Sequence, residues 1–224
     1  MAKFAKRLSF SFLLAITSIS MFKSLFADKK PPANASRDLS LVVLVDTSPH
    51  QAKVIEFERD VLNSLASAFA GSETNALLIR YGKQVQAEQQ WFPVRDLKSA
   101  SVRLILDEES PTDQRTLLND ALEAALSNLE KVNADGSKVL VVIGEGNDSG
   151  SVAKYKAIKK RAVHAEVQCF VLLVASHNLM GGRLRQYGFD LYDLASATNA
   201  KAYDIEQSRK NVDKAIRDMQ KRIQ

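Results

Sequence analysis

The chain has 224 residues, of which 46% are hydrophobic and 25% are charged, and it carries a net charge of +5. This composition is ordinary for a soluble globular protein, and the length suits one α/β domain with a short appendage. Four of the positive charges lie in the first 27 residues, which contain no acid: Lys3, Lys6, Arg7 and Lys23. Residues 28–224 therefore carry a single net positive charge, which does not support a basic nucleic-acid-binding surface.

The first 27 residues have the layout of a secretory signal peptide. A basic start is followed by the apolar stretch Leu8–Ile19, and Ala27 suits cleavage. The apolar stretch is shorter than the roughly 20 residues that cross a bilayer. We expect cleavage after Ala27 and a secreted or periplasmic protein. The alternative is an uncleaved membrane anchor, the one case in which we expect contact with a membrane.

Residues 28–38 are polar and contain Pro31-Pro32, so they are predicted to form a linker before a domain over residues 39–224. The only cysteine, Cys169, lies in an apolar run and has no cationic neighbour in the sequence. We expect it to be a buried structural thiol. With no disulfide possible within the chain, the domain depends on its hydrophobic core, and roughly 195 residues are enough to build one.

Strands alternate with helices along the domain, which is typical of a mostly parallel sheet. Three aliphatic runs predict central strands that are buried on both faces: Leu39–Val45, Val139–Ile143 and Val167–Val174. A strand over Asn75–Tyr81 and the turn Gly82-Lys83 precede Val85–Phe92, which is predicted to be an antiparallel edge strand. Amphipathic patterns predict helices over Gln51–Ala70, Leu97–Leu106, Thr116–Val132, Val152–Ala165, Leu191–Thr198 and Ser208–Ile223, with a last short strand at Lys201–Asp204.

The predicted fold class is therefore α/β: a doubly wound, mostly parallel six-stranded sheet with one antiparallel edge strand and helices on both faces. Polar segments follow two of its central strands, beginning at Asp46 and at Glu145. Ligands bind beyond the carboxyl ends of the strands in such sheets. A helix that begins near Thr116 should turn its N-terminus to the same edge. We expect Asp46, Ser48 and Thr116 to converge there, with Glu145 and His50 beside them.

These segments resemble the von Willebrand factor type A family in their order and spacing. Asp46–His50 stands where the family has its Asp-x-Ser-x-Ser metal loop. Thr116–Leu122 looks like the family's Thr-x-Leu-x-Asp-Ala-Leu helix start, and Val141–Ser149 looks like its Asp-Gly loop. The resemblance covers Leu39 to Ile223 and, with the signal peptide, is similar to exported bacterial members. It implies a Rossmann-like fold with a divalent cation at the sheet rim.

Two positions depart from the family pattern, because His50 replaces the second serine and Glu145 replaces the aspartate. A histidine nitrogen suits transition ions, whereas oxygen ligands suit Mg²⁺. The resemblance therefore implies a degenerate metal site, either altered or lost, with Mg²⁺ or Mn²⁺ expected ahead of Zn²⁺. The metal-ligating residues that it implies are Asp46, Ser48, His50, Thr116 and Glu145, and the partner-contacting residues are Thr47, Pro49 and Asp148. Helix capping is the ordinary alternative role for Ser48 and Thr116.

The sequence favours a binding module over an enzyme. It contains no Gly-x-Ser-x-Gly elbow, no phosphate-cradling glycine loop and no His-Glu-x-x-His motif. We expect an exported domain that binds an unidentified protein partner, and a rim cation could accept a carboxylate of that partner. The alternatives are a metal-free structural or assembly domain and, less favoured, a hydrolase. Tyr81 and Trp91 are predicted to be packing residues.

Overall fold

The computed structural model describes residues 38–71, 73–107, 115–132, 136–174 and 188–223. Two sequence-based predictions concern residues outside these ranges. They are the signal segment 1–27 and all but the last residue of the linker 28–38.

The described residues form one mixed sheet with the strand order β3-β2-β1-β5-β6-β7. Its parallel strands are β1 (Leu39–Asp46), β2 (Thr74–Tyr81), β5 (Ser137–Gly144), β6 (Gln168–Leu173) and β7 (Ala202–Asp204). Two short strands, β3 (Val85–Ala87) and β4 (Phe92–Pro93), pair antiparallel with β2. The described sheet thus has seven strands where six were predicted, because the polar stretch Glu88–Gln90 divides the predicted edge strand in two.

The prediction that β1, β5 and β6 are the central strands is confirmed, since each has a paired neighbour on both sides. The side chains of β1 alternate between two hydrophobic cores. Leu41, Val43 and Val45 belong to one core, and Val42 and Leu44 belong to the other. An aliphatic run without polar interruption is what a strand covered on both faces requires.

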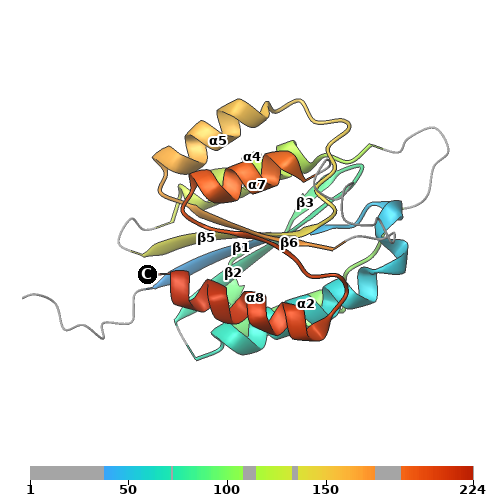
Figure 1. Ribbon diagram of the computed structural model, residues 1–224, viewed down its shortest axis with the longest axis vertical. Coiled ribbons are helices and arrows are strands. Elements are labelled where there is room, and N and C mark those ends of the chain that lie inside the picture. Colours follow the sequence, from blue (N-terminus) through green and yellow to red (C-terminus); the bar gives the residue numbers. More distant parts are fainter. Residues whose placement is uncertain (1–37, 72, 108–114, 133–135, 175–187, 224) are drawn as a thin grey trace, which may run out of the picture. The chain divides into compact units, whose positions relative to one another are not determined.

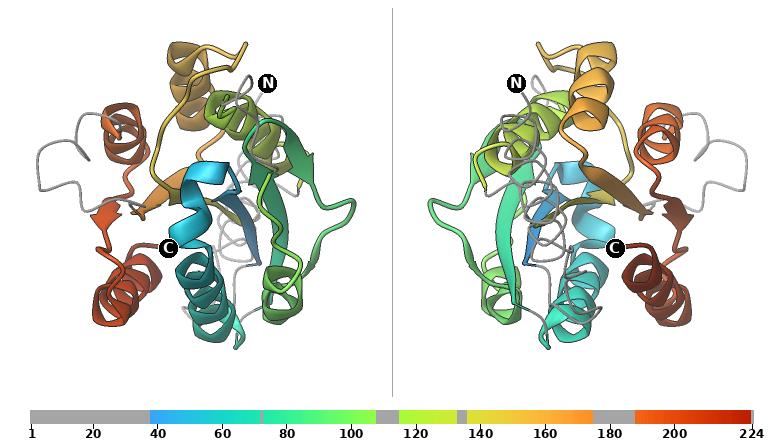
Figure 2. Two further views of the ribbon diagram at one scale, coloured as in Figure 1. Left: turned by 90° about the vertical axis from the view of Figure 1, so that its right-hand side faces the viewer. Right: turned by 90° about the vertical axis from the view of Figure 1, so that its left-hand side faces the viewer.

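Helices cover both faces of the sheet, as Figure 1 shows. One core packs against α2 (Ile55–Phe69), α3 (Leu97–Ser101) and α8 (Arg209–Arg222). The other packs against α4 (Leu118–Leu129), α5 (Tyr155–His164) and α7 (Phe189–Ala197). The side views of Figure 2 separate these two helical layers. In the described part of the chain, no helix combines the length and the apolar character needed to cross a membrane.

Four predicted helices begin later than their patterns suggested; α5 starts at Tyr155 instead of Val152, and α8 at Arg209 instead of Ser208. The predicted helix over Leu97–Leu106 ends early, at Ser101. The segment after β1 first forms the short 3-10 helix η1 (Pro49–Lys53), and α2 starts only at Ile55. The third predicted helix starts at Leu118 instead of Thr116. The backbone N–H groups of Thr116 and Leu117 instead donate to Ser149 Oγ and to the carbonyl of Gly82.

Candidate functional site at the carboxyl edge of the sheet

Asp46 ends β1 as a buried carboxylate with 1% of its surface exposed. Its Oδ1 accepts the backbone N–H of Ser48 at 2.9 Å, and its Oδ2 lies 3.5 Å from the amide nitrogen of Gln51. Burial raises the pKa of Asp46 to about 7 against the hydrogen bonds from Ser48, and the charge of Glu145 raises it further. A carboxylate removed from water in this way costs free energy unless a proton or a cation compensates its charge.

Three segments that are distant in sequence meet around this carboxylate. A β-carbon at Gly82 would lie 3.2 Å from the backbone nitrogen of Ser48, and the Gly82 carbonyl accepts the N–H of Leu117 at 2.9 Å. The adjacent Thr116 is 1% exposed and exchanges hydrogen bonds with Ser149. The loops after β1 and β5 and the start of α4 therefore form one rim, which faces the viewer in the left view of Figure 2.

Glycine at position 144 lets Asp46 fit between β2 and β5. Gly144 has φ +147°, and a β-carbon there would lie 2.6 Å from the β-carbon of Asp46 and 2.8 Å from the hydroxyl of Tyr81. The next glycine, Gly146, also has a positive φ and packs beside Gly188 at the start of α7. The loop after β5 can therefore pass close to Asp46 and to the start of α7, because these two residues lack side chains.

The fold is similar to that of several solved structures, although sequence comparisons find no match. No family model matches the chain, and no curated protein matches its sequence. Solved structures do match. An aerotolerance-related membrane protein from Bacteroides fragilis, crystallised with multiple mutations to serines, has a TM-score of 0.61 and 15% identity, covering 83% of this chain and 98% of that one. The VWA domain of SpRpn10 has a TM-score of 0.54 and 13% identity, covering 80% and 94%.

The chain has a von Willebrand factor type A fold. A third similar structure is the pilus adhesin SpaC from Lactobacillus rhamnosus GG, with a TM-score of 0.56 and 11% identity. The match covers 84% of this chain and 30% of the adhesin. The fold that the sequence motifs implied is therefore confirmed. Identities at this level concern the fold alone, so the roles of individual rim residues depend on their own geometry.

Four of the five implied metal-ligating residues of this type A domain supply oxygen atoms at or near the rim: Asp46, Ser48, Thr116 and Glu145. Glu145 is half-buried, and its charge acts on Asp46. This oxygen donor set suits Mg²⁺ or Mn²⁺. In the described residues, no group of three or more acidic, histidine or cysteine side chains is arranged to hold a metal. A rim cation would therefore depend on the hydroxyl groups of Ser48 and Thr116.

His50 does not take the position that the family pattern implied. It is exposed on η1, and Gln51, the fully buried next residue, contacts Asp46 instead. The tight turn of η1 explains the exchange, because the N–H of Gln51 bonds the Ser48 carbonyl and the side chain of Gln51 turns inward. A nitrogen ligand that would favour Zn²⁺ is thus replaced near Asp46 by an amide.

The residues that the resemblance implied as partner contacts have structural positions in the type A domain. Thr47 is buried and donates to the carbonyl of Tyr81, and Pro49 is half-buried at the start of η1. Asp148 accepts hydrogen bonds from the backbone and side chain of Asn119 at 3.1 and 3.0 Å, and from Ser151 at 2.5 Å. It thereby satisfies the first turn of α4 and fixes the loop after β5.

Sequence reasoning missed a second buried acid, Glu58 in the first turn of α2, which is 0% exposed. Burial raises its pKa well above the usual value, and the charges of Asp46 and Glu145 raise it further. Tyr81, predicted to be a packing residue, is fully buried, but its hydroxyl is close to Asp46. An acid on the apolar stripe of α2 was the available signal, since Glu58 lies between Val54 and Val61 at helical spacing.

Cys169 has the role that the sequence predicted. It is a free, buried thiol in β6, and burial raises its pKa to about 12. A thiol with so high a pKa is neutral at physiological pH and is a poor nucleophile.

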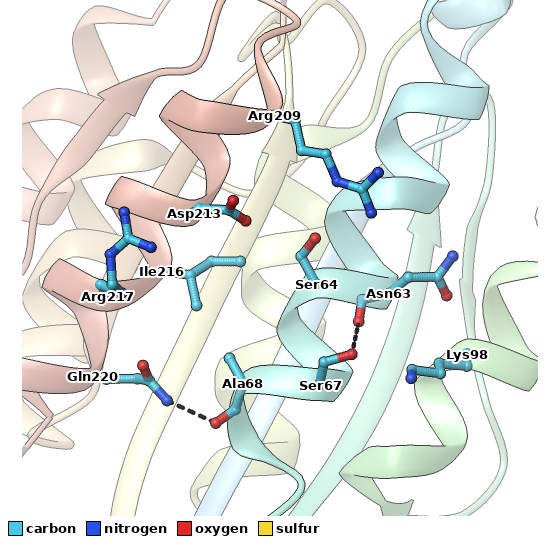
Figure 3. Close-up of a pocket in the computed structure, with 10 residues that line it drawn as sticks. All are labelled: Asn63, Ser64, Ser67, Ala68, Lys98, Arg209, Asp213, Ile216, Arg217 and Gln220. Atoms are coloured by element: carbon cyan, nitrogen blue, oxygen red, sulfur yellow. Dashed lines mark hydrogen bonds between the residues drawn. The ribbon is translucent and has the colours of Figure 1, made fainter.

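A separate groove lies between α2 and α8 (Figure 3). Its volume is about 720 Å³, and three cationic side chains and one acid line it: Lys98, Arg209, Arg217 and Asp213. The Gln220 amide donates to the Ala68 carbonyl across it at 2.6 Å. The groove shares no residue with the rim, so we treat it as a different surface.

Proposed function

We propose that this chain is an envelope or extracellular interaction module that binds a protein partner through the rim around Asp46. The observation that carries the proposal is that two loops and the start of α4 meet around a buried carboxylate at the carboxyl edge of a type A fold. The predicted signal segment supports export. So do the similar structures, which include a protein described as an aerotolerance-related membrane protein and one described as a pilus adhesin.

Exposed apolar side chains on segments that lead to the rim suit a protein partner. Val152, in the loop after β5, is 83% exposed, and Phe189, beside the Gly146–Gly188 contact, is 69% exposed. Ile105 is 71% exposed and lies two residues before Asp107, whose N–H donates to the Thr47 carbonyl. Apolar side chains around a polar centre are a common composition of a protein-binding surface.

We propose further that the rim takes Mg²⁺ or Mn²⁺ when it binds its partner, held by Asp46, Ser48, Thr116 and Glu145. A bound cation would accept a carboxylate of the partner and would compensate the buried charge of Asp46. If the rim takes no cation, partner binding depends on hydrogen bonds and apolar contacts alone, and the domain is a metal-free assembly module. With or without a cation, the proposed role of the rim is to bind a partner and not to catalyse a reaction.

Site-specific photo-crosslinking in the producing host tests the interaction surface. A photoreactive residue at Val152 should give a discrete adduct with another protein. The matched control is Val163, which is also exposed but lies on α5 near its end. We expect an adduct at position 152 and none at position 163. Adducts of equal yield at both positions, or at neither, would refute a rim-specific partner.

A further inference from the structure

Four buried oxygen atoms behind the rim have no hydrogen-bond partner within the described residues. They are both carboxylate oxygens of Glu58, the amide oxygen of Gln51 and the hydroxyl of Tyr81. All three residues have 0% exposure. A buried polar atom without a partner costs about 1–3 kcal/mol, so four of them together call for an explanation such as a bound water or ion.

Two of these three residues, Gln51 and Tyr81, lie beside Asp46 and come from separate elements. The amide nitrogen of Gln51 contacts Asp46 Oδ2, which leaves the amide oxygen of the same side chain beside it. Tyr81 is the cross-strand neighbour of Asp46, and a β-carbon at Gly144 would lie 2.8 Å from its hydroxyl and 3.2 Å from Asp46 Oδ2. The Tyr81 hydroxyl and the Asp46 carboxylate therefore share the same small space.

Glu58 faces the same region from α2. The backbone bonds from Val54 to Gln51 and from Glu58 to Val54 place Glu58 two helical turns after Gln51, on the same buried side. The charges of Asp46 and Glu58 each raise the pKa of the Tyr81 hydroxyl, which is consistent with this proximity.

The group is rich in acceptors and in negative charge. Asp46 and Glu58 are both buried carboxylates, and neither forms an ion pair with a lysine, arginine or histidine of the described residues. The Gln51 amide oxygen can only accept. A water molecule donates two hydrogens and neutralises no charge, whereas one divalent cation would satisfy the oxygens and balance both carboxylates.

We propose that Asp46, Gln51, Glu58 and Tyr81 form an inner cation site, beneath the rim, for a hard divalent ion of the Ca²⁺ class. Ca²⁺ accepts a bidentate carboxylate together with amide and carboxylate oxygens in irregular geometry, whereas Mg²⁺ demands a near-ideal octahedron. The inner site uses neither Ser48 nor Thr116. It shares Asp46 with the proposed rim cation, but its other three members, Gln51, Glu58 and Tyr81, belong to the inner site alone.

Calorimetric titration with Ca²⁺ and sensitised Tb³⁺ luminescence test the inner site on the full chain after EDTA treatment. Tb³⁺ replaces Ca²⁺ and emits when a neighbouring tyrosine is excited, so Tyr81 would act as a built-in reporter. We expect one Ca²⁺ per chain. Glu58→Gln should weaken Ca²⁺ binding more than about 100-fold, beyond the usual cost of losing a supporting residue. Thr116→Ala, which alters only the rim, should leave this affinity within about twofold of wild type.

Glu58→Gln keeps the shape of the side chain and removes a buried charge, so we expect it to fold. If it does not, Tyr81→Phe, which deletes only the hydroxyl, replaces it and should weaken Ca²⁺ binding about 10-fold. Ca²⁺ binding that survives Glu58→Gln but is lost in Thr116→Ala would assign the cation to the rim and overturn the inner site. No Ca²⁺ or Tb³⁺ binding to the wild-type chain would overturn it as well, and water would then fill the space.

Discussion

The carboxylate of Asp46 and the hydroxyl of Tyr81 both border the space that a side chain at position 144 would occupy. A β-carbon at Gly144 would lie 3.2 Å from Asp46 Oδ2 and 2.8 Å from the Tyr81 hydroxyl. The site thus depends on a glycine in β5 as much as on the acid in β1.

Gly144→Ala should destabilise the domain by about 2–4 kcal/mol, because it adds both a steric clash and a strained φ of +147°. Urea denaturation measures the loss. Gly71→Ala is the control: Gly71 has nothing within 4 Å of an added β-carbon, so its variant should stay within about 0.5 kcal/mol of wild type. Equal stabilities for the two variants would show that the space at Gly144 is not restricted.

Asp46 should make the stability of the cation-free domain depend on pH. Its pKa rises from 3.8 to about 7 on folding, so the folded state binds the proton more tightly. Proton binding to Asp46 therefore makes its full contribution to the unfolding free energy below about pH 4. This contribution is lost as the pH rises through about 7. A pKa that is higher by about three, at 1.36 kcal/mol for each pKa unit, corresponds to about 4 kcal/mol of unfolding free energy.

The matched variant for this effect is Asp46→Asn, which cannot titrate. Chemical denaturation of both proteins in EDTA between pH 4 and 8 gives the difference in unfolding free energy. The wild type should lose stability relative to Asp46→Asn as the pH rises. A difference that stays constant above pH 5 would mean that Asp46 has an ordinary pKa.

Asp148 should stabilise the domain through α4, because it accepts the first-turn N–H of Asn119 from a different loop. Asp148→Ala should cost about 1–2 kcal/mol, the usual value for a lost helix cap. Asp148→Asn, which keeps one acceptor, should cost less. Thermal unfolding of both variants beside Asp213→Ala, which removes an exposed acid on α8, measures the effect. A loss for Asp213→Ala as large as that for Asp148→Ala would remove the special role of Asp148.

The central strands could be predicted from sequence because burial on both faces leaves an aliphatic run in β1, β5 and β6. Parallel topology places the loops after β1 and β5 at one edge of the sheet, and the hydrogen bond from Leu117 to the Gly82 carbonyl ties the start of α4 to that edge. The helix starts were less predictable. Thr116 begins an apolar pattern, but tertiary hydrogen bonds to Ser149 and Gly82 delay α4 by two residues.

The inner members of the site could not be predicted from motif spacing. The family pattern indicated His50, but the 3-10 turn of η1 exposes His50 and buries Gln51. Glu58 interrupts the apolar stripe of Val54, Val61 and Leu65 without lying in any motif. Its proximity to Asp46 and Tyr81 depends on how α2 packs against the sheet. A local sequence pattern does not determine that packing.

The proposed binding of a protein partner depends on a rim that Asp46 organises. The most direct test is the crosslinking yield from a photoreactive residue at Val152, compared between the wild-type background and Asp46→Asn, with circular dichroism melts to verify folding of both. We expect a discrete adduct in the wild-type background and its loss in Asp46→Asn. An adduct of undiminished yield in a folded Asp46→Asn protein would show that partner binding does not need the Asp46 carboxylate.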